Sequence, residues 1–170
     1  MSNIVLVGFM GTGKSVVGKL LAEKLCREFL ELDEIIEKRE GVSIKDIFEK
    51  KGEGYFRRLE KSVVKDASEK KDAVISAGGG AIVDEENFKN LKKSGVIISL
   101  EASPDIILRR TRDLATRPIL NVSNPKAKIE ELLKKREPYY KKADFRINTD
   151  NLTVKQVVEK IIELGGLTAL

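Results

Sequence analysis

Short apolar segments alternate along the chain with longer segments in which apolar residues recur every three or four positions. A short apolar run is typical of a strand that is buried on both faces, and the longer spacing is that of an amphipathic helix. The strand-like segments are residues 4–7, 29–33, 73–76, 96–100 and 145–147. Strands that alternate with helices in this way predict an α/β fold, with an open five-stranded parallel sheet covered by helices on both faces.

Several helix boundaries can also be placed from the sequence. Residues suited to capping a helix N-terminus precede three of the predicted helices: Ser43, Asp84 and Ser103. The triplet Gly52-Glu53-Gly54 is expected to break the helix that begins after Ser43. Because no repeat or linker divides the chain, residues 1–170 are predicted to form a single domain.

The first strand leads directly into a glycine-rich segment, residues 8–15, which read Gly-Phe-Met-Gly-Thr-Gly-Lys-Ser and are followed by the apolar stripe of a helix. This is the G-x-x-x-x-G-K-[ST] pattern in the strand–loop–helix context of a phosphate-binding loop. Its glycines let backbone N–H groups point at a phosphate, and the helix N-terminus adds its dipole. Lys14 is expected at the β- and γ-phosphates, and Ser15 is expected to ligate Mg²⁺. The predicted nucleotide-binding residues here are Gly11, Thr12, Gly13, Lys14, Ser15 and Val16.

Composition narrows the class of partner. The formal net charge of +5 suits an anionic ligand, but basic and acidic residues are interleaved and aromatic residues make up only 5%. This pattern disfavours nucleic acid as a partner. No stretch approaches eighteen apolar residues, and the single cysteine, Cys26, permits no intrachain disulfide. We therefore expect a cytoplasmic monomer that binds neither nucleic acid nor membrane, with Cys26 buried or half-buried.

The chain contains no histidine. Any general base must therefore be a carboxylate, a lysine or the substrate itself. Phosphoryl transfer tolerates this restriction, because its loose transition state requires positioning and charge neutralisation more than a strong base.

A second group of residues suggests a phosphoryl acceptor. Ligands of open parallel sheets bind beyond the carboxyl ends of the strands, where Asp33 and the loop Gly78, Gly79, Gly80 are expected. A carboxylate there can hold or deprotonate a hydroxyl, and Arg57 can clamp a carboxylate. Taken singly, each also has a purely structural interpretation: Asp33 as a helix N-cap, Arg57 as a solvated surface charge and the glycines as a flexible turn.

Arginines are concentrated in the segment that includes Arg109, Arg110, Arg112 and Arg117, with Arg136 following in the next helix. Residues 112–125 show no clear periodicity, and we expect them to form a mobile lid. A lid arginine over the γ-phosphate would stabilise transition-state charge, and Arg117 is the candidate; the alternative is a solvated basic surface.

The acid that usually ends a second strand and orients Mg²⁺ in such enzymes is missing, because the third strand ends at Ser76. The second strand ends in acids, Glu31 and Asp33. Either one of them acts on the metal through water, or the metal depends on Ser15 and the phosphates alone.

Taken in order, these motifs resemble the shikimate kinases over essentially the full chain. The phosphate loop alone is shared by many nucleoside triphosphatases, but the spaced set is far more specific: residues 8–15, 29–33, 55–60 (Tyr-Phe-Arg-Arg-Leu-Glu), 76–81 (Ser-Ala-Gly-Gly-Gly-Ala), 117–120 (Arg-Pro-Ile-Leu) and 136–140 (Arg-Glu-Pro-Tyr-Tyr). The resemblance implies a nucleoside-monophosphate-kinase-like fold with strand order 2-3-1-4-5. It also implies transfer of the ATP γ-phosphate to the 3-hydroxyl of shikimate, in the chorismate pathway to aromatic amino acids.

The resemblance also implies roles for individual residues. Shikimate would be bound by a helical region over about residues 33–60 and by the triple glycine, through Asp33, Arg57, Gly79, Gly80 and Arg136, with the two arginines on its carboxylate. Lys14 and Arg117 would neutralise the transferring phosphoryl group. Arg110 would lie against adenine, with residues 148–151 on its other side. Glu31 stands where the family usually has an aspartate associated with water ligands of magnesium.

Two other classes of function stay open from the sequence. One is a kinase for a different small acceptor, such as gluconate or a nucleoside monophosphate, because gluconate also carries a carboxylate. The other is a nucleotide-gated protein that hydrolyses ATP as a switch.

Overall fold

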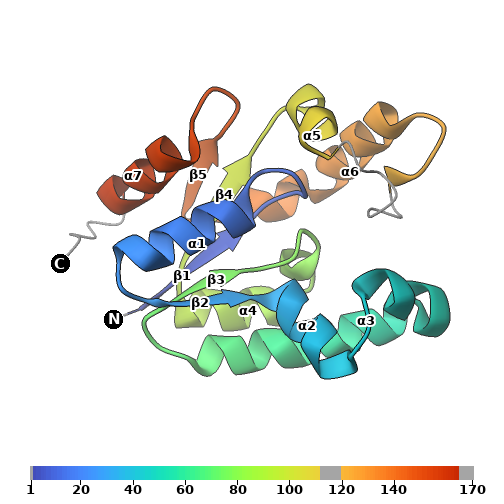
Figure 1. Ribbon diagram of the computed structural model, residues 1–170, viewed down its shortest axis with the longest axis horizontal. Helices are drawn as coiled ribbons and strands as arrows, with labels where there is room; N and C mark the ends of the chain where they lie inside the picture. Colours follow the sequence, from blue (N-terminus) through green and yellow to red (C-terminus); the bar gives the residue numbers. More distant parts are fainter. Residues whose placement is uncertain (1, 112–119, 165–170) are drawn as a thin grey trace.

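The computed structural model describes residues 2–111 and 120–164, which form a five-stranded parallel sheet with helices on both faces (Figure 1). The strands are β1 (Asn3–Val7), β2 (Glu28–Glu31), β3 (Ala73–Ser76), β4 (Gly95–Glu101) and β5 (Phe145–Asn148). Their order across the sheet is β2-β3-β1-β4-β5, and every neighbouring pair is parallel. Both the predicted fold class and the implied strand order are confirmed.

The helices of the described residues are α1 (Lys14–Lys24), α2 (Leu32–Glu40), α3 (Ile44–Glu69), α4 (Glu85–Ser94), α5 (Pro104–Arg110), α6 (Pro125–Tyr140) and α7 (Val154–Leu164), with a short 3₁₀ helix η1 (Ala81–Val83). None of them is both long and apolar enough to cross a membrane.

Alternation along the central strand divides the core into two layers. Ile4 and Leu6 of β1 pack with α1 and α7, whereas Val5 and Val7 pack with α3, α4 and α6. Figure 1 shows α1 and α7 on one side of the sheet and α3 and α4 on the other. Because successive side chains of a strand point to opposite faces, a central strand with every residue buried requires cover on both sides.

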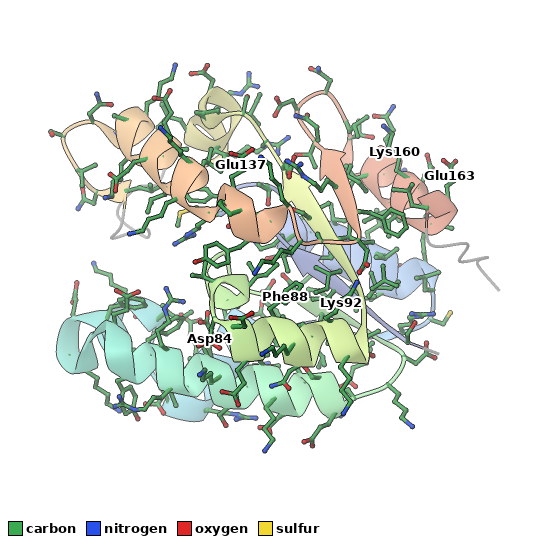
Figure 2. The ribbon with its side chains drawn as sticks, turned by 180° about the vertical axis from the view of Figure 1, so that it is seen from behind. Asp84, Phe88, Lys92, Glu137, Lys160 and Glu163 are labelled. Atoms are coloured by element: carbon green, nitrogen blue, oxygen red, sulfur yellow. The ribbon has the colours of Figure 1, made fainter. Side chains whose placement is uncertain are left out.

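All three predicted N-caps precede helices, and two of them, Ser43 and Asp84, make capping hydrogen bonds, whereas the Ser103 side chain makes none. The Ser43 hydroxyl accepts a hydrogen bond from the backbone N–H of Asp46 at 3.1 Å. The Asp84 carboxylate accepts from the N–H groups of Glu86 and Asn87, and Figure 2 shows Asp84 at the start of α4. Each cap satisfies N–H groups that the first helical turn leaves unpaired.

The second strand is shorter than predicted. It ends at Glu31, and α2 begins at Leu32, so Asp33 lies in the first turn of a helix and not at a strand end. Leu32 and Ile36 are each 1% exposed, so this i, i+4 pair places the apolar face of a helix against the core. An acid in the first turn also interacts favourably with the helix dipole.

The predicted break after residue 51 is a kink. Only Gly52, with φ 78° and ψ 168°, leaves helical geometry, and the helix continues through Gly54 to Glu69. The prediction for Cys26 is wrong: this residue is exposed, in the turn between α1 and β2. Its apolar neighbour Leu25 takes the packing position there.

Candidate active site

The phosphate loop follows β1 and ends at the N-terminus of α1. Gly11 has φ 77° and Gly13 has φ 96°, backbone conformations that side chains disfavour, so both positions require glycine. The buried Thr12 hydroxyl donates to the Phe9 carbonyl at 2.7 Å, which fixes the loop from within. Lys14 Nζ donates to the same carbonyl at 3.1 Å. Ser15 and Val16 lie exposed in the first turn of α1, beside the loop.

The triple glycine after β3 is where the predicted charged residues meet. A Cβ atom placed on Gly78 would lie 2.9 Å from Asp33 Oδ1. One on Gly79 would lie 3.2 Å from Arg136 Nη1, and one on Gly80 would lie 2.8 Å from Arg57 Nη1. The three side chains come from α2, α6 and α3, so the loop collects groups that are far apart in sequence. Glycine is needed because any side chain here would enter the space of these charged groups.

The triple glycine also lies next to the phosphate loop. The Cβ position on Gly79 is 3.2 Å from the Gly8 carbonyl oxygen and 3.6 Å from the Met10 N. The Tyr140 hydroxyl donates to the Gly79 carbonyl at 2.7 Å, which ties the end of α6 to this loop. The Arg136 guanidinium lies 5.4 Å from the centroid of the Phe9 ring, within cation–π range. One region therefore contains both the phosphate loop and the predicted acceptor residues.

Glu60 is a site residue to which sequence reasoning gave no role. It is 3% exposed and accepts a hydrogen bond from Arg57 Nη1 at 2.8 Å. Burial raises the pKa of its carboxyl, while the charge and hydrogen bond of Arg57 oppose that rise and the charge of Asp33 adds to it. The available signal was its i, i+3 spacing from Arg57 on one helix. Glu53 contacts the same arginine from the preceding turn, at 3.1 Å from Nη2.

Glu31 and Ser15 provide oxygen groups that fit a magnesium ion. Glu31 is 9% exposed, and its Oε2 has no hydrogen-bond partner among the described residues. Burial raises the pKa of Glu31, and a hydrogen bond from Ser15 and the charge of Lys14 partly offset this. A buried carboxylate oxygen without a partner beside a serine hydroxyl suits a hard cation. The described residues contain no cluster of three or more histidine, cysteine or acidic ligands.

Arg110 connects the phosphate loop to the turn after β5. Its Nη1 donates to the Gly11 carbonyl at 3.3 Å and to the Thr149 hydroxyl at 3.0 Å, and its Nη2 donates to the Thr149 carbonyl at 3.1 Å. The two segments expected beside adenine are thus neighbours. Arg117 and most of the predicted lid, residues 112–119, lie outside the described residues.

A parallel sheet in this strand order, with a phosphate loop beside a cluster of charged side chains, defines a P-loop phosphotransferase with a nucleoside-monophosphate-kinase-like fold. Comparison with known proteins specifies the family. The Shikimate kinase family model matches residues 10–164. This chain belongs to the shikimate kinase family.

Individual relatives are similar in sequence to nearly the whole of this chain. A shikimate kinase of Thermodesulfovibrio yellowstonii is 52% identical over 96% of this chain and 94% of its own length. One of Caldanaerobacter subterraneus is 48% identical, covering 95% of each. The structure of shikimate kinase from Acinetobacter baumannii in complex with shikimate is 41% identical, with a TM-score of 0.93 over 96% of this chain and 92% of that one.

Proposed function

We propose that this protein transfers the γ-phosphate of ATP to the 3-hydroxyl of shikimate, giving shikimate 3-phosphate and ADP on the route to aromatic amino acids. The observation that carries the proposal is the meeting of Asp33, Arg57 and Arg136 on the triple glycine beside the phosphate loop. Family membership and the similarity to the A. baumannii enzyme, whose structure is a complex with shikimate, support shikimate as the acceptor.

The acceptor is held through its carboxylate and through its reacting hydroxyl. Arg57 and Arg136 are the proposed clamp for the carboxylate, because both guanidinium groups border the triple glycine from different helices. The backbone of Gly78, Gly79 and Gly80 lets the ring approach without side-chain obstruction. Asp33, which lies across the same loop, accepts a hydrogen bond from the reacting hydroxyl and orients it.

The donor is held by the phosphate loop. The N–H groups of residues 11–16 and the Lys14 ammonium bind the β- and γ-phosphates. Arg110 and the turn over residues 148–151 border the proposed adenine position, a role supported by the hydrogen bonds of Arg110 to Thr149. Arg117, on a lid over about residues 112–125, is the proposed second cation at the transferring phosphoryl group.

Magnesium is the proposed metal. Ser15 would ligate it directly, and Glu31 would act through a water molecule, as the unpartnered Oε2 beside Ser15 suggests. When bound, the ion would neutralise negative charge that develops on the phosphates during transfer. We further propose a cytoplasmic monomer, with residues 1–170 as one kinase domain in which residues 33–60 form the acceptor-binding region. No nucleic acid or membrane partner is proposed.

The test is ADP release with MgATP, coupled to NADH oxidation, with shikimate, without acceptor, and with gluconate or AMP. We expect rapid ADP formation only with shikimate, and a product heavier by one phosphate in mass spectrometry. Turnover with gluconate or AMP alone would overturn the assignment of the acceptor. ADP release at the same rate without acceptor would favour an ATPase switch.

A further inference from the structure

A cavity of about 200 Å³ lies beside the phosphate loop, which contributes Phe9 and Thr12 to its lining, between α6 and the strands β4 and β5. Apolar residues with little or partial exposure form its inner part: Phe9, Ala102, Leu133 and Tyr140. Four charged side chains surround its opening: Glu101, Lys134, Glu137 and Arg146. Figure 2 labels Glu137 on α6, on the side of that helix nearer to β4. The functional assignment uses none of the four charged residues.

The charged side chains at the opening differ in whether they have an ion-pair partner. Arg146 makes a two-point ion pair with Glu101, at 2.6 Å and 3.2 Å. Glu137 pairs with Lys141 at 2.8 Å. Lys134, in contrast, makes no ion pair with any residue in 2–111 or 120–164. The opening therefore presents one ammonium group that is available to an incoming anion.

The volume limits what can enter. A cavity of about 150 Å³ lined by apolar side chains accommodates benzene, so about 200 Å³ has room for one six-membered ring and a small substituent. An aromatic ring is suited to the inner part, because Phe9 and Tyr140 can pack against it. A carboxylate on that ring would lie at the opening, within reach of the Lys134 ammonium.

We propose that this cavity is a second ligand site, which binds a small single-ring aromatic monocarboxylate separately from the acceptor site. The separation follows from the lining. Arg57, Asp33 and the triple glycine do not line the cavity, and Arg136, which is on the same helix, contacts Phe9 beside the proposed acceptor region.

Benzoate is the probe, titrated into ¹⁵N-labelled protein at constant ionic strength and followed by backbone chemical shifts. Saturating shikimate is present throughout, so that the acceptor site is occupied. We expect saturable shift changes that centre on Ala102, Leu133 and Arg146. Benzamide, which has the same shape without the charge, should bind more weakly than benzoate.

Lys134→Met tests the proposed contact, and Lys135→Met is its matched control. Both lysines are exposed neighbours on α6 and both changes remove one positive charge, but only Lys134 lines the cavity. We expect Lys134→Met to raise the Kd of benzoate about two- to fivefold, the range of a partly exposed ion pair, and Lys135→Met to leave it unchanged. The proposal is overturned if no saturable shifts occur with shikimate present, or if the two variants behave alike. If benzoate does not bind while shikimate is present, the proposed kinase activity is unaffected, because ADP release tests that activity separately.

Discussion

Arg136 is held in place by its surroundings before any substrate binds. Its guanidinium lies over the Phe9 ring, and one turn further along α6 the Tyr140 hydroxyl is bonded to the Gly79 carbonyl. A guanidinium that is already positioned loses little conformational entropy when it binds a carboxylate.

Replacing this arginine should therefore chiefly reduce acceptor affinity. For Arg136→Ala we expect the Kd of shikimate to rise about ten- to one-hundredfold, the cost of a lost charge-assisted contact, when measured by isothermal titration calorimetry. Lys135→Ala, one position earlier on the same helix, is the control and should leave the Kd unchanged. Unaltered affinity in Arg136→Ala would remove this residue from the carboxylate clamp.

Arg57 is held by two carboxylates that differ in burial. The Glu60 side chain is 4% exposed and that of Glu53 is 65% exposed. Because an ion pair shielded from water holds its partner more firmly, Glu60→Gln should raise the KM for shikimate about fivefold, equivalent to about 1 kcal/mol. Glu53→Gln should change it less than twofold. Steady-state kinetics at saturating ATP separate the two, and equal effects would contradict the positioning role of Glu60.

Glu31 illustrates a conflict between stability and function. Because burial raises its pKa above the ordinary value of 4.5, the folded protein binds more protons than the unfolded chain above that pH. Ionisation of this group therefore lowers the free energy of unfolding as the pH rises from about 4.5 to the folded-state pKa. When it is ionised, Glu31 supplies a negative charge at the proposed metal site.

Glu31→Gln should accordingly have opposite effects on the two properties. Without magnesium at pH 7, the variant is expected to unfold at a higher temperature than the parent, and the difference should shrink near pH 4. Its kcat/KM with MgATP should fall about ten- to one-hundredfold, as for other residues that support metal ligands. Thermal unfolding at both pH values and kinetics at varied magnesium are the measurements. A variant less stable than the parent at pH 7 would contradict this account.

At the scale of elements, the kink in α3 separates residues 44–51 from the part that carries Arg57. Gly52 adopts φ 78° and ψ 168°, a region that is essentially restricted to glycine, whereas Gly54 is helical. Beyond its own stretch of α3, no atom of the described residues lies within 4 Å of a Cβ on Gly52, so conformation, and not crowding, requires glycine there.

This pair of glycines offers a matched test. Gly52→Ala should lower the free energy of unfolding by about 1–3 kcal/mol, the cost of a residue in this strained region. Gly54→Ala should raise it by about 0.4–1 kcal/mol, because alanine reduces the entropy of the unfolded chain and favours the helix. Urea denaturation distinguishes them. A gain in stability in Gly52→Ala would show that the kink is not maintained by this residue.

The sequence predicted best those features that depend on residues close together in the chain. Apolar runs located the five strands of the sheet, and the capping residues Ser43 and Asp84 located two helix starts. It was less informative about Asp33, because a buried Leu32 fits a strand end and a first helical turn equally well. The positioning role of Glu60 was not predictable either. An acid three residues from an arginine is common on exposed helices, and only packing against the triple glycine makes this one buried.

At the scale of the whole molecule, the fold brings together groups that the chain separates widely. The phosphate loop follows β1 and the triple glycine follows β3, so both lie beyond the carboxyl ends of the parallel strands, and Arg110 at the end of α5 contacts the phosphate loop. This arrangement explains why spaced motifs could predict that these segments lie together without any contact being known. It does not fix the role of a residue that acts only when both substrates are bound.

Arg117 is such a residue, and its proposed role makes a distinct prediction. If it neutralises charge on the transferring phosphoryl group, its contribution is realised mainly in the transition state. Arg117→Ala should then lower kcat about 10²- to 10³-fold, the usual cost of one electrostatic contact in a transition state, with little change in the Kd of shikimate. Arg109→Ala, which removes the same charge from an exposed position on α5, is the control and should retain kcat within about twofold. An effect confined to KM would instead make Arg117 a binding residue, and phosphoryl transfer would then depend on Lys14 and the metal alone for its positive charge.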